Sequence, residues 1–145
     1  MSYKVLLTTS GIGSRLGDLT DYNNKCLVRI GDKPAISLII ENYPEEINFV
    51  VTLGHYGNHV KEFLQITYPN RNFEFVYVDN YKGPGSSLGY SILQAKALLQ
   101  CPFIFTACDT LFSSSSIIEK CLLEIDNFCV GDTRQDSSQY ATLLY

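Results

Sequence analysis

The most informative stretch of the chain is VLLTTSGIGSRLGDLTDYNNKCL, at residues 5–27. Its apolar start is typical of a buried strand, and the turn that follows contains Gly11 and Gly13. A strand that ends in a glycine turn exposes backbone N–H groups where no Cβ blocks an approaching ligand. Arg15 and Lys25 follow in the same loop and can place two cations over that turn. The loop is therefore suited to binding a polyphosphate.

Strand-like and helix-like segments alternate through the rest of the chain, which is typical of an α/β domain. We expect one domain, residues 1–145, with α/β/α layers around a mainly parallel sheet. The strands are expected at 4–9, 47–53, 73–78, 102–107 and about 128–131, with a short extended piece at 26–30. The helices are expected to bury Ile36, Ile39, Ile40 and Tyr43, then one face of 57–68, then Leu88, Ile92, Ala95 and Leu99, then Ile117 to Ile125.

The composition indicates a globular protein, with 46% hydrophobic and 18% charged residues. No apolar stretch reaches the roughly 18–20 residues of a membrane helix, and the N-terminus lacks the features of a signal peptide. We therefore expect a cytoplasmic protein with no membrane partner. The net charge of −4 argues against a nucleic-acid partner, because a broad nucleic-acid surface needs a basic face. Five cysteines without a C-x-x-C pair indicate reduced thiols rather than disulfides or a zinc site.

Residues with chemical potential follow the expected strands. In an open parallel sheet, ligands bind beyond the carboxyl ends of the strands. The first strand leads into the glycine loop, the third leads to Asp79 and the glycine-rich run 83–87, and the fourth leads to Asp109. These separate stretches should therefore meet at one edge of the sheet.

The motifs at these strand ends resemble the nucleotidyltransferases that join a nucleoside monophosphate to a sugar phosphate, or to a similar small phosphate such as phosphocholine. The opening pattern of that family is G-x-G-x-R-[LM]-x-x-L-T-x-x-x-P-K-x-L, which residues 11–27 match at the right spacing apart from the proline. The later runs GPGSSLGYSILQA and FIFTACDTLF are similar to the family's base-contacting turn and metal-binding strand end. The resemblance covers roughly residues 4–112.

The resemblance implies a three-layer, Rossmann-like nucleotidyltransferase fold and an enzyme. It would move a nucleoside monophosphate from CTP, UTP, GTP or dTTP to a small phosphorylated acceptor and release pyrophosphate. The family further implies a role in surface polysaccharide or lipid biosynthesis. Attack by one phosphate anion on another is opposed by charge repulsion, so catalysis of such a reaction is mostly alignment and charge neutralisation.

Roles for individual residues also follow from the resemblance. Arg15 would clamp the β- and γ-phosphates, and Lys25 would neutralise charge at the α-phosphorus. Asp109 would hold Mg²⁺, a hard cation that suits a carboxylate ligand. The other residues assigned to nucleotide binding are Ser10, Gly11, Gly13 and Ser14 near the phosphates, and Gly85 and Ser86 beside the base.

The chain departs from the family pattern in informative places. The usual proline before the lysine is Asn24, which we expect to loosen the loop that aims Lys25. The usual glycine before the metal aspartate is Cys108. The segment 140–145, YATLLY, reads as a strand about to be paired, so we expect the front portion of a longer protein. Family members supply a second metal aspartate and much of the acceptor site from a later part of the chain.

Other interpretations remain open. A non-catalytic nucleotide-binding regulatory domain of the same fold would carry the same loop. A short-chain NAD(P)-dependent reductase is disfavoured, because Leu7 replaces the first glycine of its turn and Tyr90 lacks a lysine four residues later. His55 and His59 are four residues apart, but we expect surface histidines because no third ligand is near. The preferred base, the acceptor and the oligomeric state, a homo-oligomer included, are left open.

Overall fold

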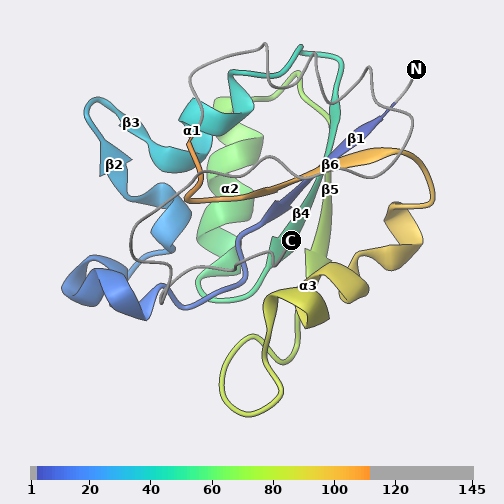
Figure 1. Ribbon diagram of the computed structural model, residues 1–145. Helices are drawn as coiled ribbons and strands as arrows, with labels where there is room; N and C mark the ends of the chain where they lie inside the picture. The colour runs from blue at the N-terminus through green and yellow to red at the C-terminus, as the bar shows by residue number, and fades with distance from the viewer. Residues whose placement is uncertain (1–2, 112–145) are drawn as a thin grey trace, which may run out of the picture.

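A computed structural model of the chain describes residues 3–111, and its architecture is the expected α/β/α arrangement (Figure 1). The strands are β1 (Lys4–Thr8), β2 (Arg29–Ile30), β3 (Lys33–Pro34), β4 (Asn48–Leu53), β5 (Phe73–Tyr77) and β6 (Phe103–Ala107). The α-helices are α1 (Ala35–Ile40), α2 (Gly57–Thr67) and α3 (Leu88–Gln94). Short 3-10 helices are η1 (Ser14–Thr20), η2 (Lys25–Leu27) and η3 (Lys96–Leu98).

The main sheet has four parallel strands in the order β5-β4-β1-β6. Its central strand β1 contains Val5, Leu6 and Leu7, none of which is exposed to solvent. A strand covered on both faces needs apolar residues at successive positions rather than in alternation. The sequence of β1 therefore matches a strand that lies between two layers of helices.

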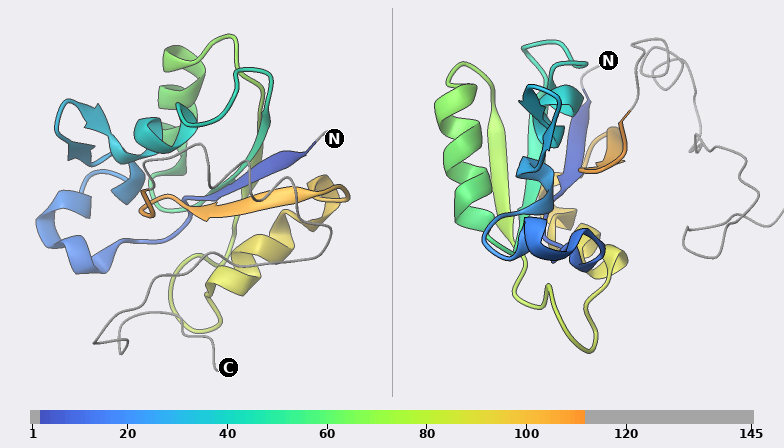
Figure 2. Two further views of the ribbon diagram at one scale, coloured as in Figure 1. Left: turned by 45° about the horizontal axis from the view of Figure 1, so that its top comes forward. Right: turned by 90° about the vertical axis from the view of Figure 1, so that its left-hand side faces the viewer.

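Two apolar clusters show how the layers are built. On one face, Val5, Leu7 and the odd-numbered residues of β4 pack against α1 and α2. On the other face, Leu6 and Val50 pack against Ala95, Leu99 and the end of α3. Figure 1 shows α1 and α2 on one side of the sheet and α3 on the other, and Figure 2 gives two further views of the same arrangement. The expected three-layer architecture is confirmed for the described residues.

Two expectations about local structure are wrong. The piece expected to be extended at 26–30 begins as η2, because the side chain of Asn24 accepts a hydrogen bond from the N–H of Cys26 and caps a helical turn. The helix expected to bury Leu88 leaves that side chain exposed, and it ends at Gln94 before a 3-10 turn leads to Leu99. Leu88 is the first residue of α3, directly after its capping residue, where the helix emerges from a loop.

The expected helix at 117–125 and the strands at 128–131 and 140–145 lie outside the described residues. Within residues 3–111, no helix has the length and apolar character required to cross a bilayer.

Candidate active site

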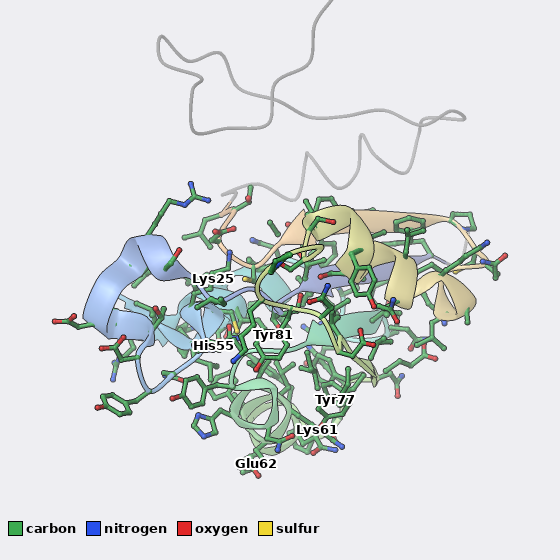
Figure 3. All side chains as sticks on the ribbon, turned by 90° about the horizontal axis from the view of Figure 1, so that it is seen from below. Lys25, His55, Lys61, Glu62, Tyr77 and Tyr81 are labelled. Atoms are coloured by element: carbon green, nitrogen blue, oxygen red, sulfur yellow. The ribbon has the colours of Figure 1, made fainter. Side chains whose placement is uncertain are left out.

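The carboxyl ends of the parallel strands gather the motif residues on one edge of the sheet. Figure 3 looks towards this edge, with Lys25 and His55 labelled near its centre. Lys25 Nζ lies 2.9 Å from Asp109 Oδ2, although the two residues are 84 positions apart in the sequence. The loop after β1 and the end of β6 therefore meet, as the strand order requires.

The amine of Lys25 is held in its charged form. Burial opposes that charge and would lower the pKa of Lys25, but the charge that Cys108 gains at high pH and the hydrogen bond and charge of Asp109 outweigh burial. The net result is a pKa of Lys25 raised above its ordinary value, even though the nearby Arg15 acts in the opposite direction. Burial raises the pKa of the Cys108 thiol to about 12, so at neutral pH the anionic partner of Lys25 is Asp109.

Arg15 lies in η1 beside this pair. Its side chain is exposed, and within residues 3–111 it makes no hydrogen bond or ion pair to another side chain or to the backbone. Its charge nevertheless acts on Lys25. Two like charges at one place repel each other, so an anion placed between them would relieve that repulsion. Arg15 and Lys25 together can therefore attract an anion, while Asp109 is the partner of Lys25 within the protein.

The glycines of the loop serve different purposes. Gly13 has a φ of +74°, and a Cβ there would lie 2.9 Å from Lys25 Cβ and 3.0 Å from Thr20 Cγ2. A Cβ at Gly11 would meet no protein atom within 4 Å. Gly13 is thus required by the packing of the loop itself. Gly11 leaves open space beside the backbone, which an approaching ligand can use.

The loop is tied to itself and to β4. The hydroxyl of Thr20 donates to the carbonyl of Gly17 at 3.1 Å, and it lies 3.3 Å from the carbonyl of Gly13. The carbonyl of Thr20 lies 2.9 Å from Nε2 of His55, which is two residues after the end of β4. His55 therefore serves as a structural partner of the loop, while His59 is exposed and stacks on Tyr56.

Asn24 does the opposite of what its departure from the family pattern led us to expect. It is fully buried, and its side-chain amide donates to the carbonyls of Thr9 at 2.7 Å and His55 at 2.6 Å. Its side-chain oxygen accepts from the N–H of Cys26 at 3.0 Å. The loop before Lys25 is fixed rather than loosened. Asparagine is a preferred N-cap residue, so the sequence could have predicted a cap at this position. The comparison with the family pattern drew attention only to the missing proline.

The serines assigned to the loop differ in accessibility. Ser10 is 4% exposed, and its hydroxyl lies 2.9 Å from the hydroxyl of Ser91 on α3. The carbonyl of Ser10 accepts from the N–H of His55 at 3.0 Å. Ser14 is exposed at the start of η1. Of the two hydroxyl groups, that of Ser14 is exposed, and among residues 3–111 it has no hydrogen-bond partner.

A second glycine loop follows β5. Gly83 and Gly85 have φ values of +79° and +85°, and Ser86 donates from both its N–H and its hydroxyl to the carbonyl of Gly83. At the base of the loop, the hydroxyl of Tyr90 donates to Asp79 at 2.6 Å. This hydrogen bond is the first cause of the lowered pKa of Asp79. The turn around Gly85 and Ser86 projects from the sheet edge and lies below α3 in Figure 1.

Asp109 is the expected metal ligand at this edge of the sheet. Among residues 3–111, no group of three or more His, Cys, Asp or Glu side chains could hold a metal ion. Asp109 has a half-exposed side chain and offers one carboxylate oxygen that is not bonded to Lys25. Mg²⁺ is commonly held by one or two carboxylates together with substrate phosphates and water. Asp109 therefore fits a magnesium ion that arrives with a nucleotide.

A hollow of about 270 Å³ lies elsewhere, at the start of α2. It is lined by Gly54, Tyr56, Gly57, Asn58, His59 and Tyr77. No lysine, arginine or carboxylate lines it, so its chemistry does not match that of the motif residues.

Comparisons with known proteins extend this picture. No family model matches the chain. The chain is 27% identical over 139 residues to the bifunctional protein GlmU of Methanococcus vannielii, covering 92% of this chain and 30% of that protein. It thus spans about a third of the length of that relative.

Solved structures share the fold. A UDP-glucose pyrophosphorylase complexed with UDP-glucose superposes with a TM-score of 0.66 at 24% identity, over 85% of this chain and 53% of that one. The CTP:phosphocholine cytidylyltransferase LicC of Streptococcus pneumoniae superposes with a TM-score of 0.59 at 24% identity, over 79% of this chain and 48% of that one. The chain therefore spans about half the length of these structures. The resemblance found in the sequence is confirmed at the level of the fold, because the chain superposes on about half of a UDP-glucose pyrophosphorylase and of a CTP:phosphocholine cytidylyltransferase.

Proposed function

We propose that this chain is the nucleotide-binding portion of a nucleotidyltransferase that uses a nucleoside triphosphate and a small phosphorylated acceptor. The observation that carries the proposal is the meeting of Lys25 and Asp109 at the edge of the sheet, with Arg15 beside them. The similarity of the fold to a UDP-glucose pyrophosphorylase and to a CTP:phosphocholine cytidylyltransferase supports the same reaction class.

The proposed reaction is a substitution at phosphorus. An oxygen of the acceptor phosphate forms a bond to the α-phosphorus of the nucleotide, and the bond between that phosphorus and the oxygen bridging to the β-phosphate breaks. Pyrophosphate leaves with the electron pair of the broken bond. The main contribution of the protein to such a reaction is alignment and neutralisation of charge.

Each motif residue has a defined task in this scheme. Lys25 is held charged near the strand ends and neutralises charge that develops around the α-phosphate. Arg15 has an exposed guanidinium, whose planar set of donors suits the β- and γ-phosphates. The open backbone at Gly11 lets the phosphates approach the turn.

Asp109 would hold Mg²⁺, which in the bound state screens negative charge between the two phosphate groups. Its other oxygen remains bonded to Lys25, so the same carboxylate orients the lysine. Gly85 and Ser86 would contact the base. The residues that would lie beside the phosphates are Ser10, Gly13 and Ser14. We further propose a place in the synthesis of surface polysaccharide or lipid.

A regulatory role is the second candidate. A domain that binds a nucleotide without transferring it would also keep Arg15, Lys25 and Asp109 together. The two functions differ only in whether pyrophosphate is released.

The direct test is an assay of pyrophosphate release by the full-length protein. CTP, UTP, GTP and dTTP are each supplied with Mg²⁺ and with a sugar 1-phosphate or phosphocholine. We expect one nucleotide and acceptor pair to give rapid release. Nucleotide binding without release for every pair would favour the regulatory role.

A thermal-shift measurement gives an independent check, because a ligand that binds the folded state raises the melting temperature. We expect the preferred triphosphate to raise the melting temperature in the presence of Mg²⁺. A rise with NADH and none with any triphosphate would instead support the reductase interpretation and contradict the proposal.

A further inference from the structure

The buried amide of Asn24 connects segments that are distant in the sequence. Its two N–H donors reach the backbone carbonyl of Thr9, just after β1, and that of His55, just after β4. Its oxygen accepts from the N–H of Cys26, within the loop itself. A primary amide has two N–H donors, and here both are used.

This arrangement encloses the backbone of Lys25. The bond from the side chain of Asn24 to the N–H of Cys26 spans Lys25, and the carbonyl of Lys25 accepts from the N–H of Val28. Lys25 is therefore the first residue of a capped 3-10 turn, η2. The cap fixes the point from which the long lysine side chain leaves the backbone.

The position of that point is important because the remaining restraints on Lys25 are weaker. Its side chain is restrained by the pair with Asp109, whose side chain is 54% exposed, and it leaves no room for a Cβ at Gly13, which would lie 2.9 Å from Lys25 Cβ. An ion pair that is open to solvent gives little energy with which to hold a flexible side chain. The buried bonds of Asn24 do not compete with water in the same way.

We propose that Asn24 is a positioning residue for Lys25, joining the loop to the ends of β1 and β4 so that the amine is delivered to the phosphate site. This role rests on the proposed function of Lys25. It would replace, by side-chain hydrogen bonding, the stiffness that a proline supplies at the same place in the family pattern.

The first test uses two substitutions of different severity in the full-length protein. Asn24→Ser keeps an oxygen that can cap η2 but loses the bridge to at least one of the two strand ends. Asn24→Asp keeps the shape of the side chain, but a carboxylate cannot donate to the carbonyls of Thr9 and His55. We expect Asn24→Ser to lower turnover about tenfold while the KM for the triphosphate changes by less than about threefold. Asn24→Asp should lower turnover further.

The second test asks whether Asn24 acts through Lys25. In a Lys25→Ala background, Asn24→Ser should change turnover by less than about twofold, because the group that it positions is gone. A full tenfold loss in both backgrounds would overturn the inference. Val60→Ala serves as the control, because it removes a fully buried contact between α2 and β4 at a distance from the loop. That variant should lose stability without the selective loss of turnover.

The third test does not depend on activity. Crystal structures of wild type and Asn24→Ser are compared for the position of the Lys25 side chain. We expect the contact between Lys25 Nζ and Asp109 Oδ2, 2.9 Å in wild type, to be lost in Asn24→Ser. An unchanged contact would overturn the inference. Near-normal pyrophosphate release by Lys25→Ala would instead refute the proposed function, and the structural comparison would still decide the role of Asn24.

Discussion

The two glycine loops at the edge of the sheet are held in different ways. The loop from Ser10 to Lys25 is bonded to the ends of β1 and β4 through buried groups of Asn24 and through Thr20. The loop from Asp79 to Leu88 is held by its own backbone turn and by the exposed bond from Tyr90 to Asp79. Under the proposed function, the first loop would have to align the phosphates with the bond that breaks. The second loop would only have to place its backbone beside a flat base.

This difference predicts that changes in the first loop reduce turnover, whereas changes in the second reduce nucleotide affinity. The largest effect is expected at Asp109, which contacts the first loop. Asp109→Asn removes the charge that would hold Mg²⁺ and pair with Lys25, so Mg²⁺-dependent pyrophosphate release should fall to background. Glu41→Gln is the matched control, because it breaks the exposed pair with Lys33 outside the site and should leave release intact. Near-normal release by Asp109→Asn would refute its metal role.

The next effect is expected at Lys25. Lys25→Ala should lower turnover by about a hundredfold or more, because a cation aimed at developing charge is lost, while triphosphate affinity changes far less. Steady-state kinetics with varied nucleotide separates the two quantities. Lys33→Ala, which removes another ion-paired lysine, should leave both unchanged. A loss of triphosphate affinity with unchanged turnover would show that Lys25 only binds the nucleotide, and would contradict its proposed role in catalysis.

The glycines of the first loop should separate stability from binding. Gly13→Ala forces a Cβ against Lys25 at a φ of +74°, so the free energy of unfolding should fall by about 2 kcal/mol. Gly11→Ala meets no protein atom, so stability should change by less than about 0.5 kcal/mol while triphosphate affinity falls. Urea unfolding and nucleotide titration measure these quantities. Equal destabilisation by both substitutions would show that Gly11 is held by the fold as well.

A smaller effect is expected in the second loop. Gly85→Ala strains a residue with a φ of +85° and places a Cβ 3.0 Å from the side-chain nitrogen of Asn80. The KM for the nucleotide should rise by about tenfold, corresponding to roughly 1.4 kcal/mol of lost binding, with turnover nearly unchanged. Gly89→Ala, which adds a Cβ in ordinary contact distance on α3, is the control and should be neutral. A turnover defect in Gly85→Ala would contradict the division between the loops.

The smallest effect concerns pH. A group whose pKa is raised on folding stabilises the protein below its ordinary pKa, and it loses that contribution as the pH rises through the raised value. For Lys25 the ordinary value is 10.5, so its contribution should persist at neutral pH and decline only above that value. The contribution is expected to be below about 1 kcal/mol, because Asp109 is half-exposed. Comparing the unfolding of wild type and Lys25→Met from pH 8 to about pH 11 measures it.

Periodicity and motif spacing were sufficient to predict the layers of the fold and the meeting of the strand-end motifs at one edge of the sheet, but not the ion pair between Lys25 and Asp109. The spacing of apolar residues indicates which faces of the helices and strands are buried. In a parallel sheet, the carboxyl ends of the strands then lie at the same edge. The role of Asn24 could not be found this way. Its partners Thr9 and His55 lie 15 and 31 residues away, and they accept through backbone carbonyls that every residue type provides. Comparison with the family pattern shows only that Asn24 stands in place of a proline. It does not show which groups the side chain of Asn24 hydrogen-bonds to.

The most direct measurement is a crystal structure of the protein with a non-hydrolysable triphosphate and Mg²⁺. The account predicts that the β- and γ-phosphates lie against Gly11 and Arg15, with Lys25 directed at the α-phosphate and Asp109 at the metal. A nucleotide bound away from this loop, or a loop left empty with Arg15 and Lys25 turned to solvent, would contradict it.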